Sequence, residues 1–84
     1  MKRPPEQNPG VRVGDVFRLA EPDYRFGVGT IRLRVTHVGS TWLIDGEPWI
    51  NLRGMELRAD GSDFGMRYAL VRVAALSAAR IAPG

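Results

Sequence analysis

The side chains that could support acid–base or metal chemistry are few and scattered in this sequence. His37 is the only histidine, and the chain has no cysteine. A zinc site would have to recruit carboxylates for its other ligands, and no His-x-x-x-His spacing is present. The sequence therefore predicts no metal and no cofactor, and it places His37 at the surface or near a turn.

The serines and carboxylates fit structural roles better than catalytic ones. No serine lies in a Gly-x-Ser-x-Gly motif or next to a lysine or histidine that could act as its base. Glu56, Asp60 and Asp63 are close enough in sequence to form an acid–base pair. A glycine-rich turn, however, uses residues such as Asp60 and Asp63 to bond its own backbone. We therefore expect a protein that is not an enzyme.

Aromatic rings are stronger candidates for function. Tyr24 and Phe26 lie in a segment rich in turn residues, and Trp42 and Trp49 flank the dipeptide Asp45-Gly46 at nearly equal distance. In a small barrel such rings can line one groove, as they do in barrels that bind peptides or methylated lysine. They can also simply fill the core. We expect the core for the two tryptophans and the groove for Tyr24.

Arginine is the second feature that could bind a partner. Arg32 and Arg34 alternate with apolar residues and so share one face of a predicted strand. Five other arginines could extend this face into a stripe: Arg12, Arg18, Arg53, Arg67 and Arg72. Arginine beside exposed rings is typical of barrels that hold single-stranded nucleic acid. The alternative is a solvated face on which arginines pair with acidic residues of neighbouring strands.

The overall charge does not decide between these alternatives. The net charge is +3, but the nine acidic residues are interleaved with the twelve basic ones. Eleven of those twelve are arginine, which suits phosphate recognition but also follows from a GC-rich coding sequence.

Alternation of apolar and polar residues predicts the elements that must position these side chains. Strands are expected at 11–19, 30–38, 41–44, 49–58 and 66–73. Asp45-Gly46 is a favoured hairpin turn, 59–65 is a second turn cluster, and 20–29 is a long loop. A change of face near Gly54 predicts a bulge there, and the alanine-rich segment 74–81 predicts a short helix.

Five short strands do not bury a flat sheet well, and closure into a barrel removes the exposed edges. The expected fold is all-β, a small SH3-like five-stranded barrel with a short C-terminal helical turn. An OB-like barrel is the alternative. A single domain is expected at 11–82. Residues 1–10 are expected to form a disordered tail, because they hold three prolines and no large apolar side chain after Met1.

The expected function is a small binding or adaptor module that presents the 20–29 loop and the arginine-bearing face to a protein partner or to a second copy of itself. The alternative is a barrel that binds single-stranded nucleic acid. The candidate binding residues are Tyr24, Phe26, Arg32, Arg34, Trp42 and Trp49. No signal-like segment and no run of 18 apolar residues is present, so we expect no membrane contact and a cytoplasmic location.

Overall fold

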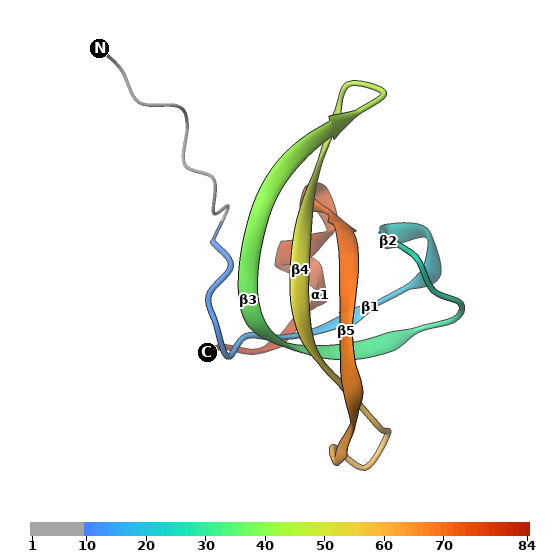
Figure 1. Ribbon diagram of the computed structural model, residues 1–84, viewed down its shortest axis with the longest axis vertical. Helices are drawn as coiled ribbons and strands as arrows, with labels where there is room; N and C mark the ends of the chain where they lie inside the picture. The colour runs from blue at the N-terminus through green and yellow to red at the C-terminus, as the bar shows by residue number, and fades with distance from the viewer. Residues whose placement is uncertain (1–9) are drawn as a thin grey trace.

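The chain folds into one antiparallel sheet that curls into a half-barrel (Figure 1). The computed structural model describes residues 10–84, so the predicted tail lies outside the described residues except for Gly10. The strands are β1 (Val16–Leu19), β2 (Tyr24–Arg25), β3 (Ile31–Ile44), β4 (Glu47–Leu57), β5 (Asp63–Arg72) and β6 (Arg80–Ala82). Between them lie two 3₁₀ turns, η1 (Glu21–Asp23) and η2 (Val73–Ala75), and one turn of helix, α1 (Leu76–Ala79). The all-β class, the small barrel shape and the C-terminal helical turn are confirmed.

Among residues 10–84 the sheet has six strands rather than the predicted five, in the order β2-β5-β4-β3-β1-β6. The predicted strands 30–38 and 41–44 are a single strand, β3, which continues through a register shift between Val38 and Thr41. The loop 20–29 contains β2, which pairs Tyr24 with Val71. The end of the predicted helix 74–81 instead forms β6. Strands of two or three residues are too short to show an alternating pattern, so the sequence could not predict β2 and β6.

The inner side of the curled sheet holds the hydrophobic core. Phe17 and Leu19 of β1, Leu33 and Val35 of β3, and Ile50 of β4 are each no more than 1% exposed. Leu76 of α1 packs into the same cluster, so the helical turn contributes to the core. The opposite side of the sheet is called the outer surface below. Most of the predicted binding residues lie on it.

The bulge predicted at Gly54 belongs to the neighbouring strand. Val35 pairs with Gly54 and His37 pairs with Arg53, so the extra residue is Thr36 of β3. Gly54 is needed for a different reason. A Cβ atom at Gly54 would clash with the carbonyl oxygen of Arg34, so β3 can approach this closely only beside a glycine. The bulge bends β3 while β4 keeps its alternation through this point.

Two hairpins set the long axis of the molecule. Asp45 and Gly46 both have positive φ, 53° and 79°, as a type I′ turn requires, so the predicted hairpin is confirmed. The β4–β5 turn is held by hydrogen bonds within it, among them the Ser62 N–H to Asp60 Oδ1 at 2.9 Å. Figure 1 shows the β3–β4 turn at one end of the molecule and the β4–β5 turn at the other.

A buried carboxylate ties the two ends of the described chain together. Asp15 is 1% exposed. It accepts hydrogen bonds from the backbone N–H of Arg12 at 2.9 Å and of Gly84 at 2.5 Å, and Arg80 lies 3.3 Å away. Desolvation raises the pKa of the Asp15 carboxyl, but the two N–H donors and the Arg80 charge together hold it below its ordinary value of 3.8.

Candidate functional site

Tyr24 does not line a groove, contrary to the expectation from its place in a loop. Pairing with Val71 adds β2 to the sheet edge and turns the Tyr24 ring into the core, where it is 3% exposed. Its hydroxyl donates to the carbonyl oxygen of Gly29 at 2.7 Å. Burial raises the pKa of the Tyr24 phenol above its ordinary value of 10.0. Tyr24 therefore anchors the 20–29 loop from inside.

Phe26, two residues later, is 74% exposed. Its φ is +76°, a left-handed conformation that bulky residues rarely adopt. The guanidinium of Arg67 donates to the Phe26 carbonyl oxygen at 2.7 Å, which helps to hold this backbone in place. The chain leaves the sheet here with the aromatic ring in solvent. Strained backbone is concentrated at functional sites. Both the exposed ring and the strained backbone therefore make Phe26 a candidate binding residue.

The two tryptophans face each other across the hairpin but have opposite environments. Trp42 pairs directly with Trp49, yet Trp49 is 5% exposed and Trp42 is 58% exposed. Arg25 and Arg72 cover the Trp49 ring, with guanidinium carbons 4.8 Å and 5.7 Å from its centroid. The expectation that both tryptophans are buried is confirmed for Trp49 and wrong for Trp42. Trp42 lies one strand further from β2, which pairs with β5 and brings Arg25 over Trp49.

Exposed Phe26 and Trp42 come together at a shallow hollow, which we call the apolar groove. It has a volume of about 250 Å³ and is lined by Phe26, Trp42, Asn51 and Leu70. Two of these residues, Asn51 and Leu70, were not among the sequence candidates. Each lies between two buried residues of its strand, Ile50 and Leu52 for Asn51, and Ala69 and Val71 for Leu70. Alternation alone could therefore have placed them on the outer surface.

A second hollow on the outer surface adjoins the first, and we call it the polar pocket. It has a volume of about 430 Å³ and is lined by His37, Gly39, Ser40, Asn51, Leu52, Arg53 and Tyr68. His37, Arg53 and Tyr68 form one row across β3, β4 and β5. The Arg53 guanidinium carbon lies 5.6 Å from the Tyr68 ring centroid. Asn51 lines both hollows, so the two lie side by side.

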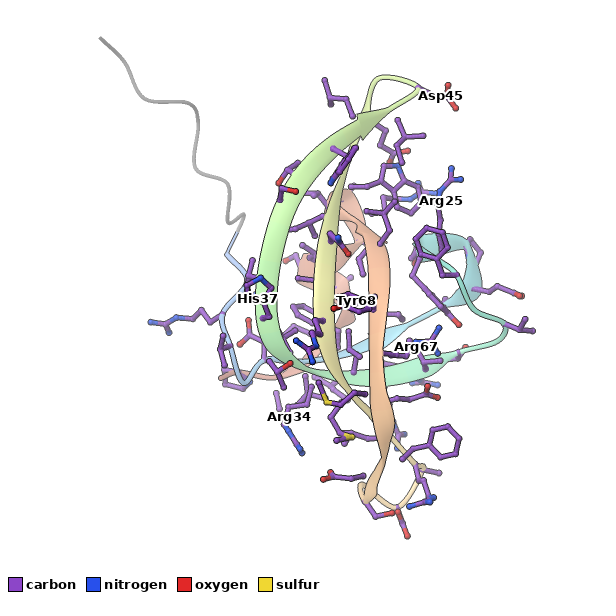
Figure 2. The ribbon with its side chains drawn as sticks, viewed as in Figure 1. Arg25, Arg34, His37, Asp45, Arg67 and Tyr68 are labelled. Carbon is purple, nitrogen blue, oxygen red and sulfur yellow. The ribbon has the colours of Figure 1, made fainter. Side chains whose placement is uncertain are left out.

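Arg32 and Arg34 lie away from both hollows, towards the β4–β5 turn. Figure 2 shows Arg34 below His37 and Tyr68, with Arg25 and Asp45 above them. Arg32 donates to the Ala59 carbonyl oxygen at 2.8 Å. Arg34 forms an ion pair with Asp63 at 3.2 Å. Both arginines therefore already have partners within the chain, which fits the solvated, paired face better than a binding stripe.

The other arginines do not join into the predicted stripe. Arg67 is paired with Glu56 at 2.9 Å beside the buried Tyr24 ring. Arg72 pairs with Asp23 at 3.6 Å and Glu47 at 3.3 Å. Arg53 is different, because it has no carboxylate partner among residues 10–84. In that range, arginines without an acidic partner therefore lie at isolated positions and do not form a continuous stripe.

The carboxylates considered for catalysis do not converge. Glu56 pairs with Arg67, Asp63 pairs with Arg34, and Asp60 accepts hydrogen bonds from Ser62. Within the described residues no group of three or more histidine and acidic side chains could hold a metal ion. In the same part of the chain no helix is long and apolar enough to span a membrane. The two neighbouring hollows on the outer surface are therefore taken as the candidate site.

Comparison with known proteins adds no family to this picture: no family model, curated protein or solved structure matches the chain.

Proposed function

We propose that this chain is a non-enzymatic binding module that docks a protein partner in the apolar groove. The observation that carries the proposal is the pair of exposed rings, Phe26 and Trp42, on either side of one apolar hollow. Exposed apolar patches with a polar rim mark interaction sites, and aromatic anchors contribute most to binding at such sites.

An SH3-like version of the barrel, expected from the sequence, is part of the proposal. Phe26 comes from the 20–29 loop and Trp42 from the β3–β4 hairpin, so the groove lies between these two elements. The long loop offers only Glu21 and Asp23 as acidic residues, which does not favour a proline-rich ligand. The proposal also includes the cytoplasmic location expected for a cysteine-free chain.

Single-stranded nucleic acid is the second candidate, and one observation favours it. Arg53 lies against Tyr68, a ring that is 60% exposed, and neither residue has an acidic partner among residues 10–84. A basic group beside an exposed ring suits base stacking with phosphate neutralisation. Nucleic acid ranks second because Arg32 and Arg34 already have partners within the chain, whereas a phosphate backbone needs several unpaired cations.

The test is selection of a random peptide display library on the full chain, followed by affinity measurement of the enriched peptides. We expect Phe26→Ala to weaken their binding about tenfold, since one interface anchor contributes on the order of 1–2 kcal/mol or more. Phe64→Ala is the matched control, because Phe64 is also exposed (64%) but lies on β5 near the other end of the sheet. Its binding should stay within about twofold of wild type.

Two results would overturn the protein-binding proposal. One is that no peptide family is enriched. The other is that the enriched peptides bind Phe26→Ala and Trp42→Ala as well as they bind wild type. Retention of a single-stranded oligonucleotide that falls steeply with salt, and that is lost in Arg53→Gln, would instead favour the second candidate.

A further inference from the structure

We infer that the partner segment carries an acidic side chain next to its apolar anchor, and that the polar pocket receives the carboxylate. The inference rests on the proposed function, because it assumes that a peptide occupies the apolar groove. It adds a second point of contact and names the chemistry of that contact.

The lining of the polar pocket is rich in donors and holds no acid. Arg53 contributes a guanidinium, His37 an imidazole, Ser40 a hydroxyl and Asn51 a side-chain amide. Even a neutral imidazole has one N–H donor, and an arginine side chain has five. No aspartate or glutamate is among the lining residues from the described part of the chain. A carboxylate placed here meets donors and a positive charge, without repulsion from a neighbouring carboxylate.

Arg53 is free to bind in a way that the arginines of β3 and β5 are not. In β3 and β5, Arg34, Arg67 and Arg72 pair with acidic residues and Arg32 with a backbone carbonyl. Within residues 10–84 Arg53 has neither kind of partner. The Tyr68 ring lies under its guanidinium instead. Stacking on a ring orients the cation while its N–H groups stay available.

The residue shared by the two hollows sets the spacing in the ligand. Arg53 lies two residues from Asn51 on β4, and Asn51 lines both hollows. At roughly 3.3 Å per residue, two strand positions span about 7 Å, which is also two positions of an extended peptide. We therefore expect the acidic residue one or two positions from the bulky apolar residue that fills the groove.

A peptide fits this surface better than a nucleic acid strand does. The polar pocket is a single cationic point beside a single apolar groove. A nucleic acid chain would present a phosphate at every nucleotide, and log affinity depends on how many of them are neutralised. The two arginines further along the outer surface, Arg32 and Arg34, already donate to Ala59 and Asp63. The positive charge at the polar pocket therefore complements one carboxylate rather than a phosphate backbone.

The experiment compares peptides enriched on wild type with those enriched on Arg53→Gln. Wild type should enrich Asp or Glu within two positions of a bulky apolar residue, and Arg53→Gln should enrich the apolar residue alone. Arg18→Gln is the matched control, since Arg18 is also exposed and unpaired with an acid among residues 10–84 but lies on β1. Selection on this variant should give the wild-type pattern.

A double-mutant cycle on the best peptide then isolates the contact. Replacing its acidic residue with the amide should weaken wild-type binding about fivefold and leave Arg53→Gln binding unchanged, as expected for an exposed charge pair of about 1 kcal/mol. Apolar enrichment without acidic enrichment would overturn this inference and leave the proposed function standing. No enrichment of either kind would overturn both. Tighter binding of a ten-residue oligothymidylate than of any selected peptide would also overturn it.

Discussion

Two regions of the molecule differ in how their polar and apolar side chains are used. Where the described chain ends meet, the buried Asp15 carboxylate is bonded to the backbone of Arg12 and Gly84 and to the Arg80 side chain. At the β3–β4 hairpin, Trp42 and Leu43 are 58% and 75% exposed. The first region pairs its buried carboxylate within the chain, and the second leaves two large apolar side chains exposed.

The difference separates residues that stabilise the fold from residues that are available to a partner. A buried charge is tolerated only when it is paired and hydrogen-bonded, so the Asp15 carboxylate and its partners are engaged in holding the fold. The hairpin end has one structural ring, Trp49, held under Arg25 and Arg72. The facing ring, Trp42, is available to a partner.

The largest effect on stability should come from Trp49→Ala. Removing a ring that is 5% exposed should lower the free energy of unfolding by about 3 kcal/mol, through lost burial and the cavity left behind. Urea unfolding followed by circular dichroism measures this change. Trp49→Phe is the control and should retain most of the stability. A loss for Trp49→Ala no larger than that for Trp42→Ala would contradict the comparison.

Asp15→Asn should come next, with a loss of about 2 kcal/mol at pH 7, because hydrogen bonds to a charged group are stronger than those to an amide. The folded-state pKa of Asp15 lies below its ordinary value of 3.8. The Asp15 charge therefore contributes its full stabilisation of the fold above the ordinary value of 3.8. That contribution is lost as the pH falls through the folded-state pKa. Unfolding free energies of both proteins between pH 7 and pH 2 test this.

The sign of that pH dependence is the decisive part of the measurement. The difference between wild type and Asp15→Asn should shrink as the pH falls below about 4, because the Asp15 carboxyl of the unfolded chain takes up a proton there, whereas that of the folded chain keeps its charge to a lower pH. A difference that stayed constant down to pH 2 would show that the charge of Asp15 does not stabilise the fold.

Trp42→Ala should have the smallest effect on stability, within about 0.5 kcal/mol of wild type, as for other surface substitutions. Its effect should appear in peptide binding instead. Single-tryptophan variants sharpen the contrast, since the chain has two tryptophans. Acrylamide should quench the fluorescence of Trp49→Phe, which keeps Trp42, far more strongly than that of Trp42→Phe. Equal quenching would mean that the two rings do not differ in exposure.

Local sequence determined much of the fold. Ile31, Leu33 and Val35 alternate with polar residues and do face the core, because a strand places every second side chain on the same side. Asp45-Gly46 specified its hairpin turn, because both positions need positive φ and these residues tolerate it. The all-β class, the small barrel shape and the helical turn near Leu76 followed from such short-range patterns.

The candidate site was only partly predictable. Phe26 and Trp42 could be named from the sequence, but so were Tyr24 and Trp49, which are buried. Nothing local distinguishes Trp42 from Trp49, since they lie at nearly equal distance from the same turn. The difference arises because β2 docks against β5 and carries Arg25 over one ring only.

What the sequence by itself determined about this protein is therefore the alternation, the turns and the fold class, which depend on residues close together in the chain. Only the tertiary structure decided which rings are covered, which arginines are paired, and that Asn51 joins the groove to the pocket. Those outcomes depend on contacts between distant segments, such as Arg34 with Asp63 and Asp15 with Gly84. Long-range pairing selects among side chains that are equivalent in the local pattern.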